Sequence, residues 1–164
     1  MKFLIILISF SIILFPVFSQ VKIENPKYNI LSFQIGKQGL LFNISYDHKF
    51  QHNNWGYKLE TGANLFKGFQ VNTVSIGSYI LKGEKNNFLE LGLDINYLYS
   101  YIPQDDVSGD GLTFFYDNYN TLYSNLNFGF RKYYKSGMFR LGFAPGYLRD
   151  RFLYGGYVSL GFKL

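Results

Sequence analysis

The sequence predicts an all-β fold, an eight-stranded antiparallel up-and-down β-barrel, and three observations lead to that prediction. Apolar and polar residues alternate with a period of two along most of the chain. Aromatic residues, which favour strands, make up 21% of the 164 residues. Short turns rich in glycine and polar residues separate the alternating segments. The chain is 48% hydrophobic, so it can bury a core and is not a disordered protein.

The first 19 residues predict a secretory signal peptide. Lys2 precedes an apolar stretch that runs from Phe3 to Phe15, and Ser19 stands at a suitable cleavage position. The stretch is short for a membrane-spanning helix, so we expect cleavage rather than a permanent anchor. The chain is therefore divided into a signal peptide, residues 1–19, and one domain, residues 20–164. The formal charge of +5 falls to +4 when Lys2 is removed.

The alternation is clearest between residues 88 and 99. Leu91, Leu93 and Ile95 point to one side of a strand, while Glu90 and Asp94 point to the other. A helix would place Leu91 and Asp94 on the same face, so the helical interpretation fails. The same pattern predicts eight strands, at residues 28–36, 39–49, 54–66, 70–82, 87–101, 120–134, 137–148 and 152–164.

The two faces of these strands differ sharply in polarity. The apolar face carries Leu31, Phe33, Ile35, Phe42, Ile44, Leu59, Val74, Ile76, Leu126, Phe128, Leu141, Phe143, Val158, Leu160 and Phe162. The polar face carries Gln34, Asn43, Ser45, Glu60, Asn64, Ser75, Asn125, Asn127, Arg131, Arg140 and Ser159. A soluble barrel also has one wet face, so alternation alone does not say which face is inside.

Three further features predict that the polar face lines the lumen and that the barrel is transmembrane. The polar face is rich in glycine, which makes room inside a narrow barrel: Gly36, Gly62, Gly77, Gly92, Gly129, Gly142 and Gly161. Its charges nearly balance, as a confined interior requires: Asp47, Glu60, Glu90 and Asp94 against Lys58, Arg131, Arg140 and Lys163. Aromatic residues gather at the strand ends, as in the two girdles of a membrane barrel: Tyr97, Tyr99, Tyr101, Tyr147 and Tyr154 at one rim, and Tyr46, Trp55, Tyr57, Tyr133 and Tyr134 at the other.

The last strand carries a resemblance to a known class of protein. Val158, Leu160, Phe162 and Leu164 alternate with small or polar residues up to the carboxyl terminus. This pattern resembles the C-terminal targeting strand of bacterial outer-membrane barrels, although that strand usually ends in Phe and this one ends in Leu164. With the signal peptide and the strand count, residues 28–164 resemble the small eight-stranded outer-membrane proteins of the OmpA, OmpX and OmpW types.

The resemblance implies a location, an orientation and partners. The protein would lie in the cell outer membrane of a Gram-negative bacterium, as a monomer in contact with membrane lipid and lipopolysaccharide, and the barrel-assembly machinery would read its last strand. With both termini in the periplasm, the turns at 50–53, 83–86 and 135–136 are periplasmic. The connections at 37–38, 67–69, 102–119 and 149–151 are then extracellular, which places the one long loop outside the cell.

Two candidate sites have weak sequence support. His48 and His52 are the only histidines, and a barrel enzyme that edits lipid A acyl chains would need one of them at the outer rim rather than at a periplasmic turn. The long loop has the spacing of a calcium loop, with oxygen-bearing side chains and a glycine at Asp106, Ser108, Asp110, Gly111 and Asp117. The flanking segments are strands rather than helices, so we expect a flexible acidic loop, with calcium binding or a protein partner as open alternatives.

No other chemistry is indicated. The aromatic residues Phe114, Phe115, Tyr116 and Tyr119 fit the outer girdle better than a partner surface. The chain lacks cysteine, which excludes disulfides and thiol chemistry, and its basic residues form no patch suited to nucleic acid. We assign no catalytic, cofactor-binding or metal residue. The expected function is that of a non-enzymatic outer-membrane barrel with a structural or surface-interaction role and no wide pore. A soluble periplasmic lipid-binding barrel and a lipid A-modifying enzyme are the alternatives.

Overall fold

The computed structural model describes residues 28–37, 42–50, 54–66, 69–101, 119–148 and 151–164, and these residues form strands and short turns. Among them no helix is long and apolar enough to cross a membrane. The strands are β1 (Tyr28–Gly36), β2 (Phe42–Lys49), β3 (Trp55–Phe66), β4 (Phe69–Glu84), β5 (Asn87–Tyr101), β6 (Tyr119–Tyr133), β7 (Gly137–Phe143), β8 (Gly146–Leu148), β9 (Arg151–Leu153) and β10 (Gly156–Lys163). The predicted signal peptide, residues 1–19, and the candidate calcium loop lie outside the described residues.

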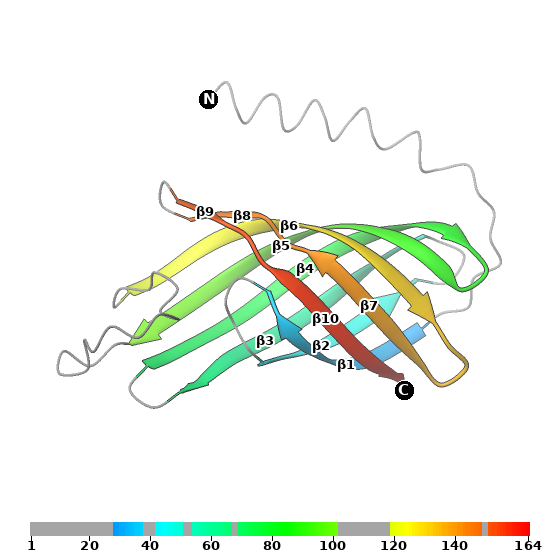
Figure 1. Ribbon diagram of the computed structural model, residues 1–164, viewed down its shortest axis with the longest axis horizontal. Helices are drawn as coiled ribbons and strands as arrows, with labels where there is room; N and C mark the ends of the chain where they lie inside the picture. The colour runs from blue at the N-terminus through cyan, green and yellow to red at the C-terminus, as the bar shows by residue number, and fades with distance from the viewer. Residues whose placement is uncertain (1–27, 38–41, 51–53, 67–68, 102–118, 149–150) are drawn as a thin grey trace, which may run out of the picture.

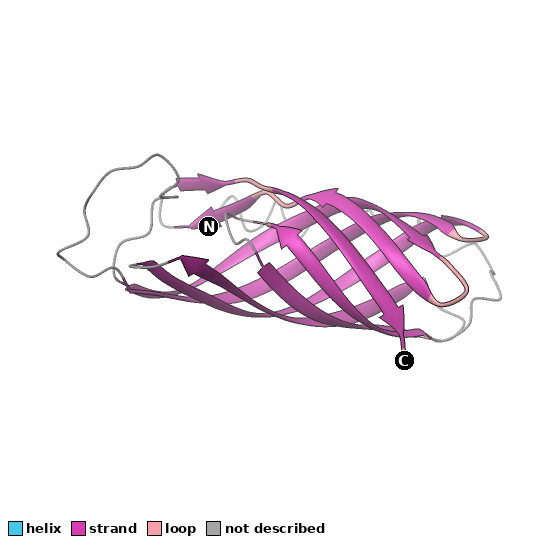
Figure 2. Cartoon of the chain, turned by 60° about the horizontal axis from the view of Figure 1, so that its bottom comes forward, coloured by secondary structure: helices cyan, strands magenta, loops and turns pink. Residues whose placement is uncertain are grey.

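The strands close into one antiparallel barrel (Figures 1 and 2). Their order is β5-β4-β3-β2-β1-β10-β7-β6, and β5 also pairs with β6, so the sheet returns on itself. The closing pair joins the two ends of the chain, with Ile30 opposite Lys163 and Gly36 opposite Tyr157. Each remaining wall strand pairs with its neighbour in sequence, which is the up-and-down topology that the sequence predicts.

The last two predicted strands are each interrupted once, which corrects the prediction of unbroken strands at 137–148 and 152–164. Pro145 has no N–H to donate, so the ladder breaks between β7 and β8. The register is nevertheless unchanged across the break, because Phe143 faces Gly156 and Gly146 faces Leu153. The Ala144 N–H bonds the Gly155 carbonyl at 2.9 Å, so each pair of segments acts as one barrel strand and the wall has eight.

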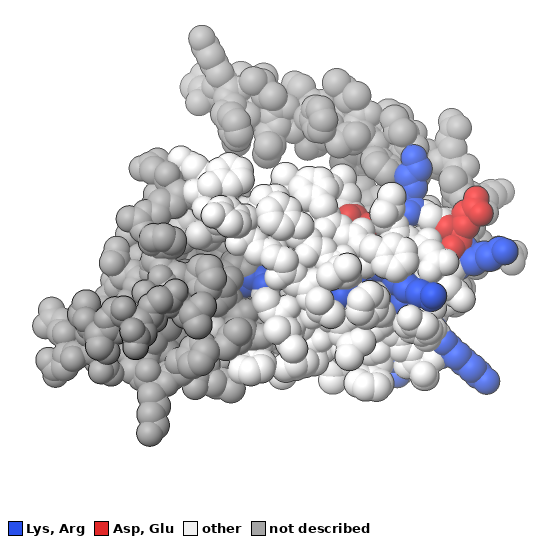
Figure 3. Space-filling model, viewed as in Figure 1, with Lys and Arg blue, Asp and Glu red and all other residues white. Residues whose placement is uncertain are grey.

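The apolar face points outward, as predicted. Every residue placed on it by sequence is exposed; Val74 is 62% exposed and Leu160 59%. The polar and charged residues placed on the other face are buried except for Lys163, and Arg131 and Arg140 have no exposed surface. Of the glycines placed on that face, Gly36, Gly129 and Gly142 are half-buried. A globular protein in water does not cover its outer surface with large apolar side chains. This arrangement therefore suits a wall that is surrounded by the hydrocarbon of a membrane. On the visible face in Figure 3, uncharged side chains cover most of the described wall.

Clusters of apolar side chains lie toward both ends of the lumen, and they were not predicted from the sequence. Near the chain termini it is filled by Ile30, Tyr79, Leu81, Phe88, Tyr133 and Met138, with Tyr28 packed against them. Toward the other end it is filled by Val71, Leu98, Tyr123 and Leu148, with Leu153 against them. Tyr133 was expected in the aromatic girdle at the periplasmic rim, and that prediction is wrong: it is 2% exposed and stacks on Tyr28 with ring centroids 4.9 Å apart.

The direction of the faces yields a prediction at Leu93, a half-exposed residue in the middle of β5. Leu93→Arg should lower the free energy of unfolding in phospholipid vesicles by about 2–4 kcal/mol, because it exposes a charge to the centre of the hydrocarbon. Leu89→Arg, on the same face but close to the β4–β5 turn, should cost only about 0–1 kcal/mol. Urea titrations followed by heat-shifted gel migration measure both. Equal losses would contradict the assigned depth.

Candidate functional site: the barrel lumen

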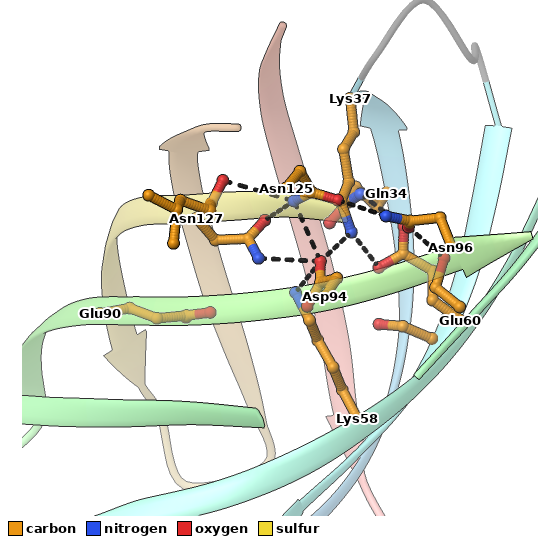
Figure 4. A network of polar contacts seen from close by, with 12 residues as sticks. Gln34, Lys37, Lys58, Glu60, Glu90, Asp94, Asn96, Asn125 and Asn127 are labelled. Carbon is orange, nitrogen blue, oxygen red and sulfur yellow. Dashed lines mark hydrogen bonds and ion pairs between the residues drawn. The ribbon is translucent and has the colours of Figure 1, made fainter. Parts of the chain in front are cut away.

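The inward side chains of the wall meet in a buried polar network between the two apolar layers (Figure 4). Its first part, the lysine cluster, consists of Lys37, Lys58, Glu60 and Asp94. The Lys37 Nζ atom lies 2.8 Å from Glu60 Oε2 and 2.8 Å from Asp94 Oδ2. Lys58 Nζ lies 3.1 Å from the same Asp94 oxygen. Asp94 thus sits between two ammonium groups, which offsets the cost of its burial.

Amide side chains complete the surroundings of Asp94. Asn127 Nδ2 donates to Asp94 Oδ2 at 2.8 Å, and Asn125 Nδ2 donates to it at 3.3 Å. Asn96 Nδ2 donates in turn to Asn125 Oδ1 at 2.6 Å, and the Ser75 hydroxyl donates to Asn96 at 2.6 Å. The chain of donors holds the carboxylate in one position and links the neighbouring strands β4, β5 and β6 along the inner face of the wall.

The second part, the arginine cluster, consists of Asp47, Glu90, Arg131 and Arg140. Arg131 binds both acids, with Nε 2.7 Å from Glu90 Oε2 and Nη2 3.1 Å from Asp47 Oδ1. Arg140 Nη1 lies 3.6 Å from Glu90 and 3.8 Å from Asp47. Two guanidinium groups therefore share two carboxylates, a charge-neutral arrangement in which each acid faces both cations.

Aromatic rings and one glutamine fix the arginines in place. The Arg131 guanidinium lies 4.1 Å from the centre of the Tyr79 ring, and the Arg140 guanidinium lies 5.0 Å from the centre of the Tyr157 ring. Arg140 also donates a hydrogen bond from Nη2 to the side-chain amide oxygen Oε1 of Gln34. Gln34 Nε2 donates to Glu60 Oε1 at 3.2 Å, so Gln34 joins the arginine cluster to the lysine cluster.

Two glycines make room for this network, as the sequence analysis expected of glycine in a narrow barrel. A Cβ atom on Gly77 would collide with the Asp94 carboxylate. A Cβ atom on Gly142 would lie 2.5 Å from the Tyr157 ring. The absence of these two side chains therefore lets Asp94 and Tyr157 lie close over the backbone of the neighbouring strand, where each is the cross-strand partner of the glycine.

Side chains fill the described lumen. Charged groups fill its middle and are paired, and apolar side chains close both ends. Among the described residues no group of three His, Cys, Asp or Glu side chains could hold a metal ion. The network offers rigid packing and charge compensation inside the barrel.

Most of these charged residues are predictable from the alternation of the sequence. All four predicted acids and three predicted cations, Lys58, Arg131 and Arg140, meet in the lumen. Lys163, the fourth, lies instead at the mouth of the barrel, with its Nζ atom 4.1 Å from the centre of the Tyr28 ring. Lys37 was missed because it follows β1 in a predicted turn. It is 2% exposed and has a backbone φ of 77°, and its side chain enters the barrel.

The histidine candidate gains no catalytic partner from its described contacts. His48 Nδ1 lies 2.7 Å from Asn29 Oδ1, and its ring stacks on Tyr57 and meets the edge of Phe50. These neighbours hold the ring at the rim of the wall, and none is a hydroxyl nucleophile placed beside it. His52 lies outside the described residues, as do Asp106, Ser108, Asp110, Gly111 and Asp117.

Several solved structures are similar to this chain, including the following three. The N-terminal β-barrel domain of Pseudomonas aeruginosa OprF matches with a TM-score of 0.63 and 12% identity, over 85% of this chain and 100% of that one. The Yersinia pestis outer membrane protein Ail matches with a TM-score of 0.52 and 12% identity, over 85% of this chain and 100% of that one. Neisserial surface protein A matches with a TM-score of 0.51 and 10% identity, over 84% of this chain and 94% of that one.

The chain has the fold of the small outer-membrane β-barrels of Gram-negative bacteria. At 10–12% identity the likeness is one of architecture, which agrees with the resemblance seen in the sequence. No protein-family model matches the chain, and no curated protein matches it significantly.

The arginine cluster yields a prediction at Arg131. Arg131→Met should lower the free energy of unfolding by about 3–5 kcal/mol, because Glu90 and Asp47 then remain buried with one cation between them. The double variant Arg131→Met with Glu90→Gln should be more stable than Arg131→Met alone, since it removes the excess negative charge. Unfolding in detergent micelles, followed by circular dichroism, measures both. A double variant less stable than the single one would contradict the charge-pairing argument.

A second prediction concerns the space at Gly77. Gly77→Ala should destabilise the barrel by about 1–3 kcal/mol, because the new methyl group displaces the Asp94 carboxylate from its lysines. Gly156→Ala is the matched control, since the nearest atom to its new Cβ would lie 3.8 Å away. The temperature at which each protein loses its fast gel migration reports the difference. Equal temperatures for the two variants would argue against a filled lumen.

Proposed function

We propose that this protein is an integral outer-membrane β-barrel, non-enzymatic, with a structural or surface-interaction role. The observation that carries the proposal is the inversion of polarity across a closed wall. Large apolar side chains cover the outside of the described barrel, while Arg131, Arg140 and all but one of the described acids lie paired inside. Such a wall is stable in hydrocarbon, where every backbone N–H and C=O must find a partner within the sheet.

The packed lumen supports the absence of a wide pore. The buried ion pairs lie across the middle of the barrel, and Phe88, Tyr133 and Met138 are among the side chains that close the end near the termini. A barrel of eight strands has an interior just wide enough for side chains to fill. A water-filled channel would require these groups to leave their partners.

The proposed partners follow from the exposed surfaces. Membrane lipid and lipopolysaccharide would cover the apolar wall. The barrel-assembly machinery would recognise the last strand, where Val158, Leu160, Phe162 and Leu164 all point outward and β10 pairs with β1 to close the sheet. We propose that the protein is a monomer, because closure of the sheet leaves no long unpaired edge strand among the described residues of the wall. The predicted surface loop, residues 102–119, would face the outside of the cell.

The alternative functions fit the structure less well. A soluble lipid carrier needs its apolar face inside the barrel, whereas Leu91, Phe128 and Leu160 point away from it. A lipid A-modifying enzyme would need a nucleophile or base partner at His48, and its described neighbours are Asn29, Phe50 and Tyr57.

Fractionation of cells that express the full chain tests the proposal. The protein should stay with the outer membrane through a carbonate wash, should leave it only in detergent, and should migrate faster in gels before heating than after. Protease added to intact cells should cut within residues 102–119 and spare the barrel. Recovery in the soluble periplasmic extract without detergent would overturn the proposal.

The closed lumen also predicts the electrical behaviour of the purified protein. Reconstituted in a planar bilayer at neutral pH, it should give no stepwise conductance, whereas a water-filled porin measured in the same bilayer should. The reason is the paired charge in the middle of the barrel and the apolar layers at both ends. Regular open-channel steps from every reconstituted sample would show that the described packing does not persist in the membrane.

A further inference from the structure

Three exposed lysines and the half-buried Lys132 gather at one end of the barrel. They lie around the β4–β5 and β6–β7 turns: Lys82, Lys85, Lys132 and Lys135, hereafter the basic arc. The two turns are neighbours, because the Tyr133 N–H bonds the Asn86 carbonyl at 2.8 Å. On the face shown in Figure 3, protruding Lys and Arg side chains gather at the end where these turns lie in Figure 1.

Little negative charge offsets the basic arc. Of the acidic side chains that the structure describes, Glu84 is the exposed one, and the others are buried in the lumen. The exposed part of this end therefore carries a clear positive excess among the described residues. Such an excess attracts anions over roughly 10 Å at moderate salt.

Two lysines of the arc point sideways from the wall rather than along the barrel axis. Lys82 pairs across the sheet with Leu89, which is 65% exposed, and Leu89 pairs with the exposed Phe130. Lys132 follows Phe130 by two residues on the same face, and its Nζ atom lies 5.5 Å from the centre of the Tyr134 ring. Both lysines therefore lie on the outer wall at the level where the exposed apolar side chains end.

This position is the level of lipid headgroups. A lysine at the border of a hydrocarbon belt lays its methylene stem along the apolar surface and keeps its ammonium group at the polar layer. Exposed tyrosine at the same height, here Tyr134, is typical of the membrane interface. An ammonium group in that layer meets lipid phosphates at close range.

We propose that the basic arc binds anionic phospholipids, of the phosphatidylglycerol or cardiolipin class, in the leaflet at this end of the barrel. The inference rests on the proposed function, which places the protein in a bilayer with this end toward the periplasm. Lys82 and Lys132 contact the lipid phosphates, and Lys85 and Lys135 on the turns add attraction from outside the headgroup layer. A soluble acidic protein is the less suited partner, because the sideways lysines face the bilayer edge.

The chain carries its own reporter for this contact. Trp55 is the single tryptophan, is 46% exposed and faces outward at the same end. It pairs with Ile80 across the β3–β4 ladder, and Lys82 is two residues further along the same face of β4. Trp55 and Lys82 are therefore diagonal neighbours on the wall. A lipid held by Lys82 will bring its upper acyl chain beside the indole ring.

The experiment uses the full mature chain in vesicles of phosphatidylcholine and phosphatidylglycerol. In one sample the phosphatidylglycerol carries bromine near the top of its acyl chains, and in the other an equal mole fraction of phosphatidylcholine carries it. Bromine quenches tryptophan on contact, so the ratio of quenching reports which lipid lies beside Trp55. We expect a preference of about threefold to fivefold for phosphatidylglycerol at low salt, falling toward one in 0.5 M sodium chloride.

Two double variants locate the effect. Lys82→Gln with Lys132→Gln should remove the preference. Lys135→Gln with Lys163→Gln removes the same charge from the same end and should keep more than half of it. Fast gel migration before heating shows that each variant has folded and inserted.

The possible results of the quenching experiment lead to different conclusions. Equal quenching by the two brominated lipids in the inserted wild-type protein overturns the lipid proposal alone, and it is the result that a soluble acidic partner would give. A preference that survives Lys82→Gln with Lys132→Gln overturns the assignment of the lipid contact to these two lysines. Failure of the wild-type chain to insert overturns the proposed function, and the lipid proposal with it.

Discussion

The structure depends on closure of the sheet through the pairing of β1 with β10. In hydrocarbon an unpaired backbone N–H or C=O costs several kcal/mol, so an open edge in the middle of the wall would outweigh any single side-chain contact. Closure with eight strands in turn sets the width of the interior, and that width leaves space for side chains alone. The glycines, the paired charges and the apolar end layers are all consequences of filling that fixed space.

The interior resolves a conflict between two requirements. The wall must be apolar outside, and a strand whose side chains alternate then has its other face free for polar groups. Those groups are buried, so their charges must be compensated within the lumen, as Asp94 is by Lys37 and Lys58 and as Glu90 is by Arg131. The same network joins strands that are distant in sequence, since Arg131 on β6 meets Asp47 on β2. Charge compensation therefore also fastens opposite walls together.

The strands and the polarity of their faces were predictable from the sequence because side chains alternate with a period of two and each face has a single kind of surroundings. That is why the outward Val74 and the buried Asn127 were placed correctly. The sequence did not reveal the lumen's apolar ends, because Phe88 and Leu98 continue a polar face and nothing local distinguishes them from wall residues. The position of Tyr133 was predicted wrongly for the same reason. The position of Lys37 depends on the route of its side chain from a turn, which periodicity does not determine, and the break at Pro145 was overlooked although proline signals it.

Lys37 gives the turn after β1 a mechanical connection to the interior. Its backbone lies beyond the end of the strand, yet its ammonium group reaches Glu60 and Asp94 on β3 and β5. A partner that draws this turn away from the barrel must extract a charge from two carboxylates at once, and Asp94 would shift against its asparagine donors. A force applied at this rim is thus transmitted to the ion pairs in the centre of the lumen. Those ion pairs hold the rim in place through Lys37.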